Sequence, residues 1–408
     1  MYNLGIYILK VLLKVLAPFN PKIKKGVLGR AETFSILKKS LSSNDDTLWF
    51  HCSSLGEYEQ GLPVFKELRK DYPNHKIVLS FFSPSGFEIR KNSEIADVVV
   101  YIPLDTIKNA KAFLSLVHPE LVVFVKYDIW PNLLDQIKIR SIRAILISAR
   151  FSKNQTYFKF YGNRLRKALF AFEHIFVQDS KSINLLNSIN YQNATISGDT
   201  RYDRVFDQLR QNNQLDFIAA FRHDALCVVI GSSWPEDEEI LVDYINTNAS
   251  KNIKFIIAPH EIKKHEIEGI RSKLDKEVAL FSNQDFDMES NKSVLIIDAI
   301  GYLSRIYSYA DIAYVGGAMG KTGLHNILEP AVFGIPVIIG KNYNRFPEAK
   351  MMIEQAGVTS VKNKKELNTV FQTLVENQEY RENEGHLNKE YIVKNKGAVV
   401  QIMSYLRR

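Results

Sequence analysis

The sequence predicts an α/β protein made of two doubly wound domains, each a parallel sheet covered by helices on both faces. Three observations lead to this fold class. The chain has 408 residues, more than one hydrophobic core usually supports, so we expect two domains of about 200 residues each. Short apolar, β-branched runs alternate with segments of helix length, as in buried parallel strands. A Gln- and Asn-rich stretch, residues 208–214, interrupts the alternation, and we place the domain boundary within residues 203–224.

The expected strands are short apolar runs bounded by polar residues or glycine. In the first half they lie at residues 48–52, 77–82, 98–102, 121–126, 144–148, 174–177 and 194–197. In the second half they lie at residues 226–230, 255–258, 278–281, 294–297, 312–315 and 336–339. The resulting domains span residues 31–210 and 211–408. Because ligands of doubly wound sheets bind at the carboxyl ends of the strands, we expect a site in a central cleft that the two domains face.

The first 30 residues form a separate segment. Residues 4–16 are apolar except for Lys10 and Lys14, which lie four apart on one helical face, and Pro18 ends the run. A spanning helix needs about 20 apolar residues, so we expect this one to be too short and too charged to cross a bilayer, and to lie at its surface. Basic residues that follow and suit anionic headgroups are Lys22, Lys24, Lys25 and Arg30. The alternative is a helix that docks on its own domain.

Composition narrows the partners and the compartment. The formal net charge of +8 fits an anionic partner, which can be a nucleotide, a nucleic acid or an acidic membrane surface. The basic residues are scattered instead of clustering with aromatic residues in one stripe, so we expect no nucleic acid partner. Only Cys52 and Cys227 are present, which indicates a reducing, cytoplasmic setting. No His/Cys group has zinc spacing, and the Asp285-Phe-Asp287 motif follows no strand, so we expect no metal.

A glycine-dense loop between Val315 and Gly340 indicates a nucleotide site. It leaves an apolar strand and enters a helix expected to open near His325 and Asn326, and such loops let backbone N–H groups approach a phosphate. A P-loop is excluded, because only three residues separate the first glycine from Gly-Lys-Thr where four are needed. A dinucleotide fingerprint belongs in the first βα unit, whereas this loop comes late.

Two interpretations of the loop stay open. In the nucleotide-sugar site of a two-domain glycosyltransferase, such a loop holds phosphate and a glutamate on the helix bonds the ribose. Glu329, one helical turn after Asn326, suits this case. The other interpretation is a tight βα turn that binds no ligand.

Glu57 is the candidate general base of the first domain. It follows the first strand at the start of a helix, after Gly56, which lets the turn tighten. A helix start favours the ionised carboxylate, so burial must raise the pKa of Glu57 before it can accept a proton near neutral pH. The alternative is an ordinary acid in the first turn of a helix.

Other polar loops also follow strands. The strand at 121–126 leads into Lys126 and Asp128, and Trp130-Pro131 sets the turn after them. Further loops of this kind lie at residues 83–86, 148–152 and 197–203, the last of which contains Arg201. In the second domain, residues 231–234 and Pro259-His260 lie where a nucleotide base or phosphate would bind.

Several of these motifs, in the same order, resemble one family. The chain is similar to the 3-deoxy-D-manno-octulosonic acid (Kdo) transferases of lipopolysaccharide synthesis, which are glycosyltransferases of GT-B architecture. The resemblance covers almost the whole chain, including its basic N-terminal membrane segment. The motifs that carry it lie at residues 51–57 (HCSSLGE), 83–86 (SPSG), 130–132 (WPN), 149–150 (AR), 197–199 (SGD) and 323–329 (GLHNILE). Singly these are weak, but all of them in register are specific.

The resemblance implies transfer of Kdo from CMP-Kdo to the lipid A precursor, lipid IVA, at the cytoplasmic face of an inner membrane. It implies an inverting reaction without metal, in which the catalytic glutamate falls on Glu57 and a basic transition-state position on Arg201. The family's CMP contacts fall on Pro259, His260, Ile300, Gly301, Tyr302, Asn326, Ile327, Leu328 and Glu329.

The chain departs from the family pattern at three positions. Lys126 stands where the family commonly has a glutamate. Either Asp128 takes the acidic role or Lys126 pairs with substrate charge directly, and we count both as candidate catalytic residues. His260 replaces an arginine, and Tyr302 replaces an acidic residue. The nearest alternative function is that of another GT-B enzyme with a UDP-sugar donor and a lipid-linked acceptor.

Overall fold

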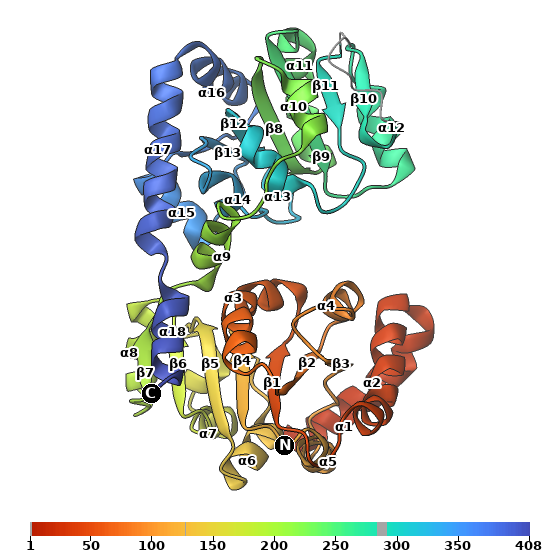
Figure 1. Cartoon of the computed structure of the whole chain (residues 1–408), viewed down its shortest axis with the longest axis vertical. Helices are drawn as coiled ribbons and strands as arrows, with labels where there is room; N and C mark the ends of the chain where they lie inside the picture. The colour runs from red at the N-terminus through yellow and green to blue at the C-terminus, as the bar shows by residue number, and fades with distance from the viewer. Residues whose placement is uncertain (1, 127, 284–291) are drawn as a thin grey trace. The chain divides into compact units, whose positions relative to one another are not determined.

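The computed structural model describes residues 2–126, 128–283 and 292–408, and the chain divides into two compact units (Figure 1). Unit 1 comprises Met1–Arg204 and Lys396–Arg408, and unit 2 comprises Val205–Asn395. The chain first passes from unit 1 to unit 2 between Arg204 and Val205, which lies inside the expected interval 203–224. The ranges differ from the expected 31–210 and 211–408, because residues 205–210 belong to unit 2 and residues 396–408 return to unit 1.

Unit 1 contains a seven-stranded parallel sheet of order β3-β2-β1-β4-β5-β6-β7. Its strands are β1 (Thr47–Cys52), β2 (Lys76–Phe81), β3 (Val98–Tyr101), β4 (Leu121–Val125), β5 (Arg143–Ala149), β6 (His174–Val177) and β7 (Ala194–Ile196). Each expected strand of the first domain is present. From the centre, β1, β2 and β3 follow one another toward one edge of the sheet, and β4 to β7 follow one another toward the other edge. The strands β1 and β4 are therefore neighbours, and their carboxyl ends lie side by side.

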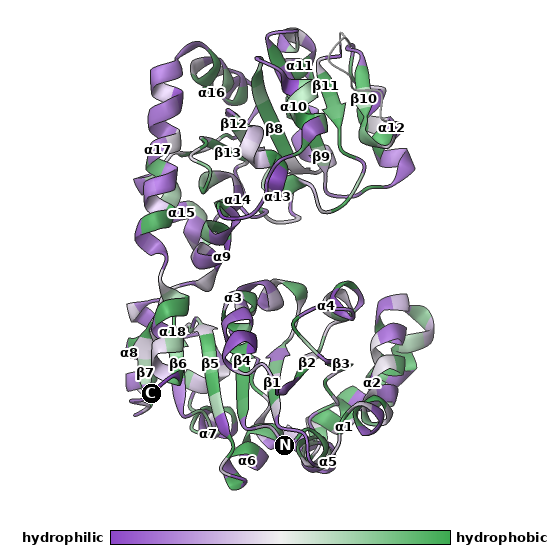
Figure 2. Ribbon diagram, viewed as in Figure 1, coloured by the Kyte–Doolittle hydropathy of each residue, from purple (hydrophilic) through white to green (hydrophobic). Residues whose placement is uncertain are grey.

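Helices cover both faces of this sheet. They are α3 (Leu55–Asp71), α4 (Pro84–Arg90), α5 (Ile107–Val117), α6 (Pro131–Ile139), α7 (Asn163–Leu169), α8 (Ser180–Asn187), α9 (Thr200–Gln208), which continues into unit 2, and α18 (Ala398–Leu406). Side chains of a strand alternate between faces. Accordingly, Trp49 belongs to one core cluster, while Leu48 and Phe50 belong to the cluster on the other face. Burial on both faces explains why most of the strands are green in Figure 2.

Unit 2 repeats this architecture with the strand order β10-β11-β9-β8-β12-β13-β14, again all parallel. The strands are β8 (Leu226–Ser233), β9 (Ile253–Pro259), β10 (Val278–Leu280), β11 (Val294–Ile296), β12 (Ile312–Val315), β13 (Val337–Ile339) and β14 (Val358–Ser360). The edge strand β14 was not expected from the sequence. It has three residues, of which only Val358 is buried, so it carries little apolar signal.

The helices of unit 2 are α10 (Asp216–Arg222), α11 (Pro235–Asn248), α12 (Lys264–Arg271), α13 (Leu303–Ile306), α14 (Leu328–Ala331), α15 (Pro347–Gln355), α16 (Lys364–Glu376) and α17 (Gln378–Asn395). The helix expected to open near His325 begins instead at Leu328 and has four residues. Asn326, which precedes the N-cap residue Ile327, accepts the Leu328 N–H through its Oδ1 at 3.2 Å.

The N-terminal segment folds as α1 (Tyr2–Leu16), a short 3-10 helix η1 (Ala17–Phe19) and α2 (Pro21–Ser40). Tyr2–Phe19 spans 18 residues with a mean hydropathy of 1.4, which is long and apolar enough for a membrane crossing by length and composition. The expectation that this segment is too short therefore does not hold. Only 6% of it is buried, so docking on unit 1 does not account for its apolar residues.

Candidate active site

Glu57 lies in the first turn of α3, beside the carboxyl ends of β1 and β4, and is 7% exposed. Its Oε2 accepts the Ser53 N–H at 2.5 Å. Burial and the nearby Asp128 carboxylate raise the pKa of Glu57 to about 7, against the opposing effects of the Ser53 hydrogen bond, His51 and Lys126. The upward pKa shift that a general base at a helix start requires is thus present.

A buried hydrogen-bond network holds Asp128 in place. His51, on β1, lies 2.7 Å through Nε2 from Asp128 Oδ2 and 2.8 Å through Nδ1 from Ser80 Oγ. Trp49 Nε1 donates to the same Ser80 oxygen at 2.8 Å, and Trp130 Nε1 donates to Asp128 Oδ2 at 3.0 Å. With Trp49 donating to Ser80, the Ser80 hydroxyl can donate to Nδ1, which leaves the Nε2 proton for Asp128. This arrangement fixes the position of the Asp128 carboxyl group.

Lys126 directly follows β4 and has a left-handed backbone, φ 70°. Its N–H donates to Ile147 O at 2.8 Å, and its charge lowers the pKa of Glu57, so the two side chains are within electrostatic reach. The structure therefore brings Glu57, Lys126 and Asp128 together.

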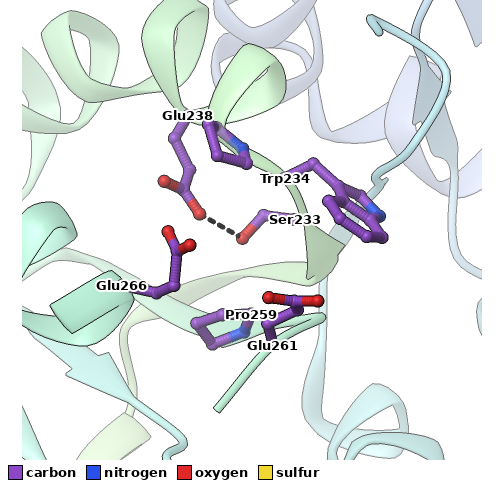
Figure 3. A pocket seen from close by; sticks show the side chains of 7 residues that line it. Ser233, Trp234, Glu238, Pro259, Glu261 and Glu266 are labelled. Carbon is purple, nitrogen blue, oxygen red and sulfur yellow. Dashed lines mark hydrogen bonds between the residues drawn. The ribbon is translucent and has the colours of Figure 1, made fainter. Parts of the chain in front are cut away.

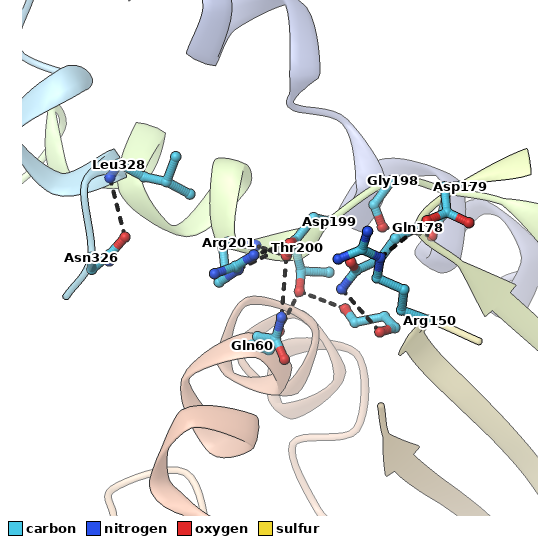
Figure 4. Close-up of polar contacts among 12 residues, drawn as sticks. Gln60, Arg150, Gln178, Asp179, Gly198, Asp199, Thr200, Arg201, Asn326 and Leu328 are labelled. Carbon is cyan, nitrogen blue, oxygen red and sulfur yellow. Dashed lines mark hydrogen bonds and ion pairs between the residues drawn. The ribbon is translucent and has the colours of Figure 1, made fainter. Parts of the chain in front are cut away.

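Arg201 follows β7 and pairs with an acid of its own loop (Figure 4). Its Nε and Nη2 donate to Asp199 Oδ2 at 2.9 and 2.7 Å. Burial alone would raise the pKa of Asp199, but Arg201 outweighs it and holds that pKa below its usual range. Thr200 Oγ1 donates to the carbonyl of Gln60 at 2.6 Å, which fastens this loop to α3, the helix of Glu57. An anionic substrate group would share Arg201 with Asp199.

In unit 2 the expected nucleotide-binding residues gather at one edge of the sheet. His260 follows β9, Tyr302 comes after β11, and Asn326 and Glu329 come after β12. In the sheet, β11 lies beside β9, and both β9 and β12 lie beside β8. Asn326 Nδ2 donates to Glu329 Oε1 at 3.1 Å, so the amide and the carboxylate form one polar pair.

The remaining predicted positions differ in what they offer a ligand. Ile327 and Leu328 are 1% and 0% exposed, so their side chains belong to the core and only their backbone is available. Ile300 is 89% exposed, and Gly301 adopts φ 97°, a conformation that favours glycine. The ring of Tyr302 packs 4.8 Å from that of Phe281.

Three aromatic rings lie together beside these loops. The Trp234 and His260 rings stack at 4.5 Å, the His260 and His325 rings are 4.4 Å apart, and Trp234 Nε1 donates to His325 Nε2 at 3.1 Å. Burial lowers the pKa of His260, while burial and His260 lower the pKa of His325 to about 4. Neutral imidazoles and an indole have ring faces suited to stacking against a base.

A small pocket opens beside Trp234 (Figure 3). Its lining residues are Ser233, Trp234, Pro235, Glu238, Pro259, Glu261 and Glu266. Ser233 Oγ donates to Glu238 Oε1 at 3.1 Å, and burial raises the pKa of Glu238. The pocket thus combines an aromatic wall with carboxylates that can accept hydrogen bonds.

The glycine loop binds an anion of the protein itself. The N–H groups of Gly317 and Met319 donate to the buried Asp237 carboxylate at 2.7 and 3.4 Å, and Tyr314 OH donates to it at 2.8 Å. A Cβ at Gly316 would lie 2.4 Å from Ser232 O, so close backbone packing accounts for that glycine. These two amides are therefore engaged inside the unit, and the tight-turn interpretation explains this part of the loop.

Comparison with known proteins identifies the family. Residues 29–204 match the family model of the 3-deoxy-D-manno-octulosonic-acid transferases (kdotransferases). A Haemophilus influenzae 3-deoxy-D-manno-octulosonic acid transferase is 29% identical over 381 residues, which cover 88% of this chain and 86% of the relative. The corresponding Chlamydophila psittaci enzyme is 28% identical over 320 residues, 75% of this chain and 72% of the relative.

The chain is similar to the Kdo transferases over most of its length. It is therefore a glycosyltransferase, and its two parallel sheets have the GT-B fold. A Neisseria meningitidis UDP-GlcNAc 2-epimerase shares this fold, with a TM-score of 0.63 at 16% identity over 89% of this chain and 100% of that one.

The sequence did not single out Ser80 or Asp237 as parts of the two networks, and it indicated His51 and Trp234 only as members of motifs. A signal for one of them exists, because His51 and Ser80 occupy paired positions on neighbouring strands. Among the residues that the structure describes, no group of three or more His, Cys, Asp or Glu could hold a metal. Asp285 and Asp287 lie outside the described residues.

Proposed function

We propose that this protein transfers Kdo from CMP-Kdo to lipid IVA in lipopolysaccharide synthesis, with Glu57 as the general base. Similarity to the Kdo transferases supports the transferred sugar. The observation that carries the base assignment is the pKa of Glu57, raised to about 7 by burial and Asp128. At that pKa the carboxylate is largely available near neutral pH and is also basic enough to take a proton.

In the proposed step, Glu57 takes the proton of an acceptor hydroxyl, and the hydroxyl oxygen forms a bond to the anomeric carbon of Kdo. The bond from that carbon to the CMP phosphate breaks, and CMP leaves with the electron pair, which inverts the anomeric centre. The step as written uses no metal and no cofactor. Arg201 and Lys126 are the cations we assign to the negative charge of Kdo and of the departing phosphate.

We assign the acidic role of the family glutamate to Asp128. His51 and Trp130 both bond its Oδ2, which supports a carboxyl group fixed in position beside Glu57. Lys126 then pairs with substrate charge. Replacing Lys126 with glutamate should lower turnover, and unchanged turnover would remove it from the mechanism.

For the donor, we propose that the base stacks near Trp234 and His260, while Asn326 and Glu329 bond the ribose. The aromatic surface and the Asn326–Glu329 pair support this assignment. For the acceptor, the exposed apolar α1 and the basic residues after it support attachment to an inner membrane, and we place the enzyme on its cytoplasmic face.

The direct test is transfer with purified full-length protein, CMP-Kdo and lipid IVA, followed by mass spectrometry of the lipid. We expect Kdo addition by the wild type and a loss of at least about a hundredfold in Glu57→Gln, since general base catalysis contributes about that much. Glu67→Gln, on the surface of the same helix, is the matched control and should retain activity. Transfer that survives Glu57→Gln would refute the proposed base.

The nucleotide that the protein binds more tightly distinguishes an enzyme with a CMP-Kdo donor from one with a UDP-sugar donor. A ligand that binds only the folded protein raises its melting temperature, and the rise grows with the logarithm of its concentration divided by its Kd. We expect CMP to raise the melting temperature more than UMP does at equal concentration. Glu329→Gln should reduce the shift with both nucleotides, because they share the ribose. A larger shift with UMP would favour the UDP-sugar enzyme instead.

A further inference from the structure

Two aromatic side chains stand exposed between the 3-10 helix η2 (Thr156–Phe158) and α7. Phe160 is 94% exposed and Tyr161 is 64% exposed, and their rings lie 5.1 Å apart in an edge-to-face arrangement. We call this pair the aromatic tip. Large apolar side chains that gather on a surface commonly mark an interaction site.

Hydrogen bonds from nearby residues of the same segment hold the loop that carries the aromatic tip. Arg166 donates to the carbonyls of Tyr157 and Lys159 at 2.9 and 2.7 Å, and Gly162 N–H donates to Lys159 O at 3.0 Å. A Cβ at Gly162 would lie 1.6 Å from Thr156 O, so the chain closes tightly here. The exposure of the two rings is thus built into the loop.

The chain segment around the aromatic tip contains basic residues and no acidic ones. Residues 153–167 contain five basic residues and no acidic one, namely Lys153, Lys159, Arg164, Arg166 and Lys167. Residues 2–30 also contain no acidic residue, and their basic residues are Lys10, Lys14, Lys22, Lys24, Lys25 and Arg30. Each segment therefore combines exposed apolar side chains with positive charge, the composition that binds anionic lipid surfaces.

A shared asparagine joins the two segments. Arg164 Nη2, at the start of α7, donates to Asn132 Oδ1 at 3.0 Å, and Asn132 Nδ2 donates to Asn3 Oδ1, in the first turn of α1, at 2.8 Å. Arg164 also pairs with Asp135 at 2.6 Å, so its own charge is compensated. Both ends belong to unit 1, and in Figure 1 the N-terminus, α6 and α7 lie along its lower edge.

We propose that the aromatic tip is a second membrane anchor, which inserts Phe160 and Tyr161 into the headgroup boundary of an anionic bilayer beside α1. This rests on the membrane attachment in the proposed function. Aromatic rings favour this boundary, and Lys153 and Lys167, both exposed, meet anionic headgroups there. A single helix leaves unit 1 free to rotate about the helix axis, whereas two contacts fix which face of unit 1 meets the lipid acceptor.

Site-specific fluorescence tests the insertion. Cys52 and Cys227 are both 0% exposed, so an environment-sensitive dye will label an introduced surface cysteine. Full-length Phe160→Cys and, as the α1 reporter, Val11→Cys are mixed with vesicles of phosphatidylcholine alone or with phosphatidylglycerol. We expect a blue shift and quenching by spin-labelled lipid at both positions on the anionic vesicles. Val400→Cys, at a 68% exposed position on α18, is the control and should show neither.

The outcomes separate this inference from the proposed function. A shift at position 11 without one at position 160 overturns the second anchor and leaves the attachment through α1 intact. No shift at either position overturns both.

A double variant gives an independent readout. Phe160→Ser with Tyr161→Ser should lower the partition coefficient on anionic vesicles by about tenfold, because two partly inserted rings are lost. Turnover on detergent-dispersed acceptor should stay unchanged, while the KM for acceptor in vesicles rises. An unchanged partition coefficient would refute the second anchor.

Discussion

At the scale of single residues, the proposed chemistry depends on groups that shift the pKa of Glu57 in opposite directions. Burial and Asp128 favour the neutral acid, while Lys126, His51 and the Ser53 N–H favour the carboxylate, and the balance sets the pKa at about 7. Asp128 therefore has two effects in our scheme, because it takes the acidic position and also keeps Glu57 basic. His51 positions Asp128 from the buried side.

The pH profile of Kdo transfer should report the pKa of Glu57. We expect kcat/KM to rise with pH through a limb near 7, since Glu57 must be ionised to accept a proton. In Asp128→Asn the limb should move to lower pH, because the charge that raises the pKa of Glu57 is gone. Asp46→Asn, before the amino end of β1, is the control. A limb that stays in place in Asp128→Asn would contradict the coupling.

The same pKa predicts how stability depends on pH. Because the pKa of Glu57 is raised from 4.5 to about 7 on folding, the native state holds this proton more tightly, and its contribution to stability is lost as pH rises through that window. Glu57→Gln has no carboxyl group to ionise at this position, so it does not lose this stability as the pH rises. Denaturant unfolding should show the variant gaining on the wild type between pH 4.5 and 8 by on the order of 3 kcal/mol. An equal difference at both pH values would be inconsistent with the raised pKa.

At the scale of elements, the glycine loop and the start of α11 form one unit through Asp237. The carboxylate accepts backbone N–H groups from Gly317, Met319 and Trp234 and the hydroxyl of Tyr314. This bonding connects the loop after β12 to the loop after β8. It thereby holds Trp234 beside the loop that leads to Asn326.

Asp237→Ala should destabilise unit 2 strongly. The change leaves a buried hydroxyl and buried N–H groups without their acceptor, and each such group costs about 1–3 kcal/mol. We expect a clear drop in the urea midpoint and faster hydrogen exchange at Gly317. Glu239→Ala, at an exposed position of the same helix, serves as the comparison and should change little. Equal midpoints for the two variants would show that the Asp237 network contributes nothing to stability.

At the scale of the whole molecule, the chain passes between the units twice. After α17 it returns to unit 1, where Ile402, Met403 and Leu406 of α18 join the core cluster of Leu48 and Phe50. The C-terminal helix is thus part of the fold that holds Glu57, although it lies more than 300 residues later in the sequence.

Removing apolar bulk from α18 should destabilise unit 1. Ile402 is 0% exposed, and Ile402→Ala should lower the free energy of unfolding by about 2–5 kcal/mol. Val400→Ala, 68% exposed on the same helix, should have a negligible effect. The measurement is thermal or urea unfolding of the full chain. Similar values for the two variants would mean that α18 does not stabilise unit 1.

Local pattern was enough to predict the strands and the order of the motifs. Buried parallel strands are nearly continuous apolar runs, so β1 to β13 are visible in the sequence, whereas β14 is too short and too polar. The position of Glu57 at the start of a helix, after a strand and beside Gly56, is equally local. Fold class, family motifs and the candidate base therefore followed from the sequence alone.

Tertiary structure decided which groups meet. The pairing of His51 with Asp128, the use of glycine-loop amides by Asp237, and the return of α18 to unit 1 each join residues 77 or more positions apart. Such contacts leave no periodic trace in a single sequence. They nevertheless set the burial and the electric field at each group, and those two quantities determine the pKa of Glu57 and the partners of Arg201.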